Sequence, residues 1–174
     1  MRPRRTKITI LIVGEGSHDC AFLIYLKALY FDKQSDLCIP DPHNGHGVDP
    51  WTVTEKAARL APDYDKTYVL VDIAKKDWPH EHKPKILSDC QIYHIEQLWA
   101  EPCCLEGFLL TILGVKKVPL VEQQCKDAWA KYSKNSKLND KRTYEIFFPL
   151  SFLELKRKSN PLLDKIINIM INGV

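Results

Sequence analysis

One stretch decides the fold of this chain: Ile8-Thr9-Ile10-Leu11-Ile12-Val13-Gly14-Glu15-Gly16-Ser17-His18-Asp19. Its first half is a short, β-branched apolar run, which is typical of a strand buried on both faces. A glycine-flanked acidic turn follows, and Ser17 can then cap a helix whose apolar residues recur at helical spacing as far as Tyr30. This order places Glu15 at the C-terminal end of a strand, where open α/β sheets bind their ligands.

The rest of the chain repeats the alternation of strand and helix. The patterns predict strands at 37–39, 67–71 and 90–95, and helices at 50–60, 83–88, 98–113, 119–132 and 161–172. Residues 40–47 have the composition of a loop, with two prolines and two glycines, and residues 144–155 fit either a strand or a helix. The order predicts an α/β fold with a mainly parallel sheet flanked by helices on both faces.

Length and composition favour an ordinary globular protein. The 174 residues fit a single domain over 1–174, with a basic tail at 1–7 and a helical C-terminal extension at about 115–174. Charge or proline interrupts every long apolar stretch, so we expect neither a membrane span nor a signal peptide. The six cysteines lack any C-x-x-C spacing, which indicates reduced thiols in a cytoplasmic protein and gives no support for a zinc site.

Positive charge is concentrated although the net charge is only +3. The basic residues cluster in three places: Arg2, Arg4, Arg5 and Lys7; Lys131, Lys134, Lys137, Lys141 and Arg142; and Lys156, Arg157 and Lys158. Such runs either contact the phosphates of a nucleic acid or form a solvated surface. Both interpretations stay open at this point.

Acidic residues supply the candidate chemistry. Glu15 and Asp72 both follow the C-terminal ends of predicted strands, and parallel order places them at the same edge of the sheet. Two carboxylates there can hold Mg²⁺ or Mn²⁺, and such an ion can activate water beside a phosphodiester. Glu106 lies inside an apolar helix and needs a partner or a metal. Lys75 and Lys76 would lie beside the ion and hold a phosphate.

Each acidic residue also has a purely structural interpretation. The helix dipole favours Glu15 and Asp19 near a helix N-terminus, and Asp72 can end a strand in a turn. Asp77 can be a solvated loop residue, and Glu106 can pair with a buried Lys or Arg.

The motifs resemble a known superfamily. The stretch Val13 to Asp19 resembles the first motif of the Toprim domain, a strand followed by E-G-x-x-D, which occurs in primases, topoisomerases and overcoming-lysogenization-defect nucleases. An ordered set is similar to the RloB-like branch, whose members are small prokaryotic proteins often encoded near restriction or phage-defence genes. The set comprises Gly47-Val48-Asp49-Pro50, Tyr68 to Asp72, Pro102 to Glu106, and Asn160-Pro161.

The resemblance implies a Toprim-like, Rossmannoid fold and a magnesium-dependent nuclease. Glu15 would match the general acid or base of the family, and Asp72 the first aspartate of its metal-binding D-x-D. The chain departs from the pattern at Ala74, which stands where the second aspartate belongs, and Asp77 is the next acid along the chain. We therefore expect the catalytic residues to be Glu15, Asp72, Glu106 and Lys75, and the metal ligands to be Glu15, Asp72 and Asp77.

Three functions follow from these observations. The first is a Toprim-type nuclease that uses Mg²⁺ or Mn²⁺ to cleave DNA or RNA, in prokaryotic phage defence. The second, favoured by Ala74, is a module that binds nucleic acid, a nucleotide or a phage protein and signals to a partner protein from the same locus. The third is an assembly subunit, in which the helix containing Leu162 to Met170 forms a homo-oligomer interface and does not pack within its own chain.

Overall fold

The computed structural model describes residues 7–31, 37–47, 49–77, 79–134 and 136–173. The predicted basic tail lies outside these residues except for Lys7, and Val48 of the second motif lies outside them too. Within the described residues the sheet has four parallel strands in the order β2-β1-β3-β4. The strands are β1 (Ile8–Gly14), β2 (Cys38–Asn44), β3 (Lys66–Asp72) and β4 (Ile95–Ala100). The α/β prediction is thus confirmed.

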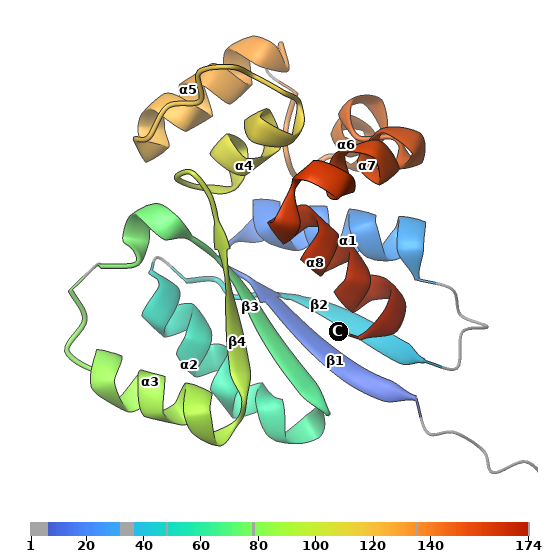
Figure 1. The fold of residues 1–174 in the computed structure, drawn as a ribbon. Coiled ribbons are helices and arrows are strands. Elements are labelled where there is room, and N and C mark those ends of the chain that lie inside the picture. The colour runs from blue at the N-terminus through green and yellow to red at the C-terminus, as the bar shows by residue number, and fades with distance from the viewer. Residues whose placement is uncertain (1–6, 32–36, 48, 78, 135, 174) are drawn as a thin grey trace, which may run out of the picture.

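Helices cover both faces of the sheet (Figure 1). One face carries α1 (Ser17–Tyr30) and α8 (Pro161–Asn172), and the other carries α2 (Pro50–Leu60) and α3 (Lys83–Ile92). Beyond the C-terminal ends of the strands lie α4 (Leu105–Ile112) and α5 (Glu122–Tyr132), followed by α6 (Lys141–Phe147) and α7 (Leu150–Lys156). Short 3₁₀ turns are η1 (Ala61–Asp63), η2 (Ile73–Lys75) and η3 (Arg157–Ser159). No helix in the described ranges combines the length and the apolar content needed to cross a bilayer.

The position of β1 inside the sheet explains why residues 10–13 are all apolar. Ile10 and Ile12 point into the core beneath α1 and α8, whereas Leu11 and Val13 point into the core beneath α2. All four side chains are inaccessible to solvent. Successive side chains of a strand face opposite sides of the sheet, so only a strand covered on both faces is apolar at every position.

The C-terminal extension shares the core of the sheet. The Tyr144 ring centroid lies 5.7 Å from that of Phe22 on α1, and the Tyr144 hydroxyl donates to the carbonyl of His18 at 3.1 Å. The apolar side of α8 is buried within the same cluster, as Leu163, Ile166, Ile167, Ile169 and Met170. Packing within the chain therefore accounts for this helix, and these buried residues do not form an exposed interface.

The second strand is longer than its sequence suggests. The prediction of a strand at 37–39 followed by a loop at 40–47 is wrong, because β2 continues to Asn44 and pairs with β1 along its whole length. Pro40 and Pro42 are two residues apart, so their nitrogens face the same side of the strand. Because β2 is an edge strand, that side can face away from β1, and no ladder hydrogen bond is lost.

The fourth strand starts later than predicted. Residues 90–92 belong to α3, which ends at a turn where His94 has a positive φ of 51°. The strand is Ile95–Ala100, with Ile95, Leu98 and Ala100 buried, so the first residues of the predicted helix at 98–113 are extended instead. That helix begins only at Leu105, and the predicted helix at 119–132 begins at Glu122. The undecided segment 144–155 falls mostly within two short helices, α6 and α7.

The turn after β1 depends on the absence of a side chain at Gly14. A Cβ atom there would lie 2.6 Å from Asp19 Cβ and 2.8 Å from the Cys20 amide nitrogen. We expect Gly14→Ala to lower the free energy of unfolding by about 1–3 kcal/mol, because backbone and side-chain atoms must shift. Thermal unfolding measures this as a fall in Tm of about 2–4 °C for each kcal/mol.

Gly16→Ala is the matched control for that variant. A Cβ at Gly16 meets only Asp19 Oδ2, at 3.6 Å, which is an ordinary contact. Equal losses of stability in the two variants would contradict the steric argument.

Candidate active site

The candidate site lies where the strand order reverses. The chain passes from β1 outward to β2 and returns to β3 on the other side of β1, and ligands bind at such switch points. Glu15 follows β1 directly, and its amide extends the ladder by donating to Leu70 O at 3.0 Å. Its Oε2 accepts from the Asp72 amide at 3.2 Å. The predicted meeting of Glu15 and Asp72 at one edge is confirmed.

A pocket of about 160 Å³ surrounds these two residues. Its wall combines the turn after β1, the end of β3 and the first turns of α4 and α5. We call it the acidic pocket. Among the described residues its charged lining comprises Glu15, Asp19, Asp72, Glu106 and Glu122, together with Lys75 and Lys126. Acids that are far apart in the sequence therefore share one cavity.

Lys75 lies between the carboxylates. Its ammonium pairs with Glu15 Oε1 and lies 3.9 Å from Asp72 Oδ2 and 4.0 Å from Glu122 Oε2. Burial alone would lower the pKa of Lys75, but the hydrogen bond and the charge of Glu15 outweigh it and raise the pKa. Lys75 is therefore a cation that partly neutralises the acidic pocket.

Asp72 is held at the start of α4. Its Oδ1 accepts from the Leu105 amide at 3.1 Å, one of the free amides of a helix N-terminus. Burial raises the pKa of Asp72 to about 8, the charges of Asp19 and Glu15 add to this, and Lys75 opposes it. Without a further cation, Asp72 is therefore largely protonated at neutral pH.

Asp19 has one carboxylate oxygen without a partner. Its Oδ2 accepts from the Gly16 amide at 2.9 Å, which agrees with a capping role. Its Oδ1 is buried and has no hydrogen-bond partner among the described residues. Burial raises the pKa of Asp19 to about 7, against the Gly16 hydrogen bond and with help from the charge of Glu15. Asp19 is therefore a buried, incompletely hydrogen-bonded carboxyl group, and the residue lines the acidic pocket.

Glu106 has a histidine as its partner. The side chain is 6% exposed, and Oε1 lies 3.5 Å from Nδ1 of His18. Burial raises the pKa of Glu106, but the hydrogen bonds of His18, of its own backbone and of Cys104, together with the charge of Lys126, outweigh burial and lower the pKa. The hydrogen bond with Glu106 raises the pKa of His18. The partner is thus neither Lys nor Arg. His18 was not predicted as the partner of Glu106. It lies in the first turn of α1, and no spacing in the sequence shows that this turn faces α4.

Two of the neighbouring residues named from the sequence lie elsewhere. Asp77 is exposed and is not among the residues that line the acidic pocket, so its role as a metal ligand stays a prediction. Lys76 is exposed, with Nζ 5.7 Å from the centroid of the Trp99 ring. Glu122 and Lys126 were also missed, because an amphipathic helix carries no sign of which polar residues will face a distant strand.

A second cavity continues from the acidic pocket. It measures about 420 Å³, shares His18, Glu106 and Lys126 with the acidic pocket, and extends along residues 136–139. We call it the side groove. Lys137, from the longest basic cluster of the sequence, lines it. Acidic and basic chemistry are therefore adjacent on this side of the molecule.

Comparison of the chain with family models, with curated proteins and with solved structures gives no match.

The pKa of Asp72 predicts how stability changes with pH in metal-free protein. An acid whose pKa rises from 3.8 to about 8 on folding keeps its proton in the folded state where the unfolded chain has released it. Stability should therefore fall as pH rises across that window. Asp72→Asn keeps the Oδ1 acceptor but removes the charge. We expect Asp72→Asn to raise the free energy of unfolding at pH 8 by at least about 1 kcal/mol. This is a lower bound, because a shift of a single pKa unit already corresponds to about 1.4 kcal/mol.

The measurement is thermal unfolding with a chelator at several pH values between 4 and 8. At pH 4 the variant and the original protein should differ least, since both side chains are then close to neutral. An advantage of Asp72→Asn that is equal at every pH would contradict the assignment.

Proposed function

We propose that this protein is a Toprim-like nuclease that cleaves phosphodiester bonds of nucleic acid with a divalent cation. One observation carries the proposal: the carboxylates of Glu15 and Asp19, and that of Asp72, which is far from them in the sequence, line one pocket at the switch point of the sheet. Carboxylate oxygens are the preferred ligands of Mg²⁺ and Mn²⁺. The ordered motifs that resemble the RloB-like branch support the same nuclease function, and they support a role in prokaryotic phage defence.

Glu15, Asp72 and Asp19 would hold such an ion, because all three carboxylates line the acidic pocket. Their oxygens do not lie at the mutual spacing of metal ligands in this structure, so the side chains would have to move together, and Glu15 away from Lys75, to share the ion. Metal binding favours deprotonated ligands, so it would offset the cost of ionising Asp19 and Asp72 in a buried pocket. When bound, the ion supplies positive charge that polarises a phosphoryl oxygen and lowers the pKa of water.

The side chains have separate tasks in this proposal. Glu15 takes a proton from the attacking water, as the resemblance to the first Toprim motif implies, and it would have to release Lys75 to do so. Lys75 moves its positive charge to a phosphate oxygen of the substrate. Lys126 and Lys137 hold the neighbouring backbone phosphates along the side groove.

A second function is favoured by a specific observation. Lys75 places an ammonium group among Glu15, Asp72 and Glu122. Ala74 stands where the second aspartate of D-x-D belongs. A pocket neutralised by a lysine needs no metal, and such a protein would bind nucleic acid, a nucleotide or a phage protein and signal to a partner.

Calorimetric titration with Mg²⁺ and Mn²⁺ separates the two functions. The nuclease should take up one ion with a defined affinity, and Asp72→Asn should abolish this uptake. Absence of specific uptake by the unaltered protein would favour the binding module.

The nuclease proposal predicts the effect of Glu15→Gln. The amide cannot accept a proton from water, so we expect metal-dependent cleavage of DNA or RNA to fall about 100-fold or more. Glu55→Gln is the matched control, because Glu55 lies on α2 and pairs with Arg59 outside the acidic pocket. Cleavage assays on single- and double-stranded substrates give the measurement. Unchanged cleavage by Glu15→Gln would reject the role of Glu15.

The side groove predicts the effect of Lys137→Ala. Loss of one phosphate contact should weaken nucleic-acid binding and reduce the slope of log affinity against log salt by about one. Lys85→Ala is the matched control, because Lys85 is an exposed lysine of α3 outside both cavities. Fluorescence anisotropy at several salt concentrations measures both quantities. Equal salt slopes for the two variants would contradict the proposal that the nucleic-acid backbone runs along the side groove.

A further inference from the structure

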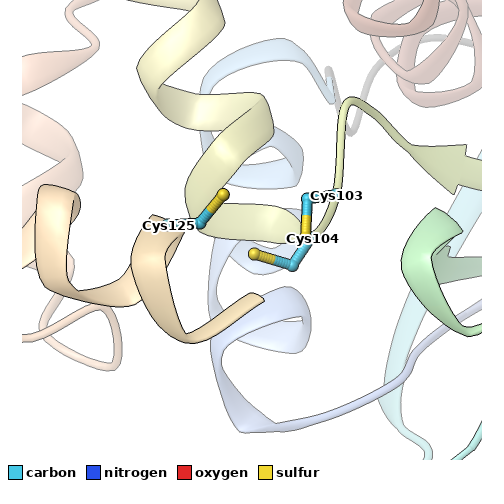
Figure 2. Close-up of side chains that lie close together, drawn as sticks. All are labelled: Cys103, Cys104 and Cys125. Carbon is cyan, nitrogen blue, oxygen red and sulfur yellow. The ribbon is translucent and has the colours of Figure 1, made fainter. Parts of the chain in front are cut away.

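Three cysteines that are separated in sequence come together behind the acidic pocket (Figure 2). Cys103 and Cys104 directly precede α4, and Cys125 belongs to α5. Their sulfur atoms all lie within 4.8 Å of one another, and all three residues are completely buried. The cluster has no C-x-x-C spacing, so the sequence does not reveal it. Two of the sulfurs come from the loop before α4, and the third comes from α5, 21 positions after Cys104.

The sulfur separations suit a metal centre. A tetrahedral zinc ion with Zn–S bonds of about 2.3 Å keeps its sulfurs about 3.8 Å apart. Separations of up to 4.8 Å therefore need only small side-chain rotations to reach this arrangement. Six free cysteines occur in the chain, and among the described residues these three form the group with metal-binding spacing.

The surroundings of the cluster hold the sulfurs in place. The Cys125 thiol donates to the Pro119 carbonyl at 3.1 Å, and the Cys104 thiol is hydrogen-bonded to the Glu106 carboxylate. A Cβ atom at Gly107 would lie 3.0 Å from Cys125 Sγ, a tighter contact than usual, so α4 passes close to the cluster at this glycine. These hydrogen bonds position the thiols in the metal-free protein and would be given up when the thiol protons leave.

A cation would have to displace protons from the cluster. Cys104 is the N-cap residue of α4, but burial raises the pKa of all three thiols, so the metal-free cluster holds its protons. Glu106 provides an oxygen donor beside Cys104, and Lys126 lines the same pocket as Glu106, where it can compensate negative charge. Binding of a divalent ion would release the three thiol protons to solvent and leave three thiolates on the metal.

We propose that Cys103, Cys104 and Cys125 bind a thiophilic d¹⁰ cation, with Zn²⁺ as the physiological ion and Glu106 or water as the fourth ligand. Soft thiolate sets select Zn²⁺ or Cu⁺ over Mg²⁺. The ion would tie the start of α4 to α5 and so fix Glu106 and Glu122 in the wall of the acidic pocket. This site does not depend on the proposed nuclease function, since it uses a different metal and its three cysteine ligands have no role in the proposed cleavage.

The test is metal titration of the full chain under reducing conditions after removal of metals with a chelator. Co²⁺ should bind with one equivalent and give thiolate charge-transfer bands together with the intense d–d bands of a tetrahedral centre. Zn²⁺ should displace it. Absence of these bands in the unaltered protein overturns the proposal, and so does uptake of Cu⁺ without uptake of Co²⁺ or Zn²⁺.

Variants locate the site. Cys103→Ser, Cys104→Ser and Cys125→Ser should each weaken zinc binding at least tenfold and weaken the charge-transfer bands. Cys90→Ser is the matched control, because Cys90 is a free thiol on α3 outside the cluster. Zinc should raise the Tm of the unaltered protein and of Cys90→Ser, and should leave that of Cys125→Ser unchanged. Equal zinc affinity in Cys90→Ser and Cys125→Ser overturns the assignment. If a cluster variant does not fold, the spectrum of the unaltered protein still decides.

Discussion

The carboxylates of the acidic pocket repel one another, and the fold must hold them together against that repulsion. Two unit charges 4 Å apart interact by about 4 kcal/mol near a protein surface, so several acids in one small cavity are costly. Three features offset the cost: the ammonium of Lys75, the amide at the start of α4, and the protons that Asp19 and Asp72 retain through raised pKa values. A site built in this way is ready to exchange protons for a cation.

The C-terminal half of the chain is part of this site. The sheet supplies Glu15 and Asp72, but α4 and α5 supply the opposite wall with Glu106, Glu122 and Lys126. Tyr144 connects the two halves, because it packs on Phe22 and donates to the backbone of His18 next to the pocket. The extension therefore completes the pocket and adds the side groove.

Local chemistry explains which parts of the structure were predictable. The apolar run of β1 and the acids that follow β1 and β3 are decided by residues close in sequence, and they were predicted correctly. The predicted cap at Ser17 is wrong by one residue, because Gly16 is the N-cap of α1. The extension of β2 through two prolines, the start of β4, and the convergence of Cys103, Cys104 and Cys125 depend on neighbours that are distant in sequence. A single sequence does not specify such neighbours, so the whole cysteine cluster was missed, and so were His18, Glu122 and Lys126 of the acidic pocket.

The two prolines of β2 have a consequence for how copies of this protein meet. A strand that lacks amide hydrogens at Pro40 and Pro42 offers no continuous row of donors along its outer side. A foreign strand therefore gains few hydrogen bonds there, and the border formed by β2 resists edge-to-edge growth into larger assemblies. The border formed by β4 contains no proline, so any intermolecular extension of the sheet would have to start on that side.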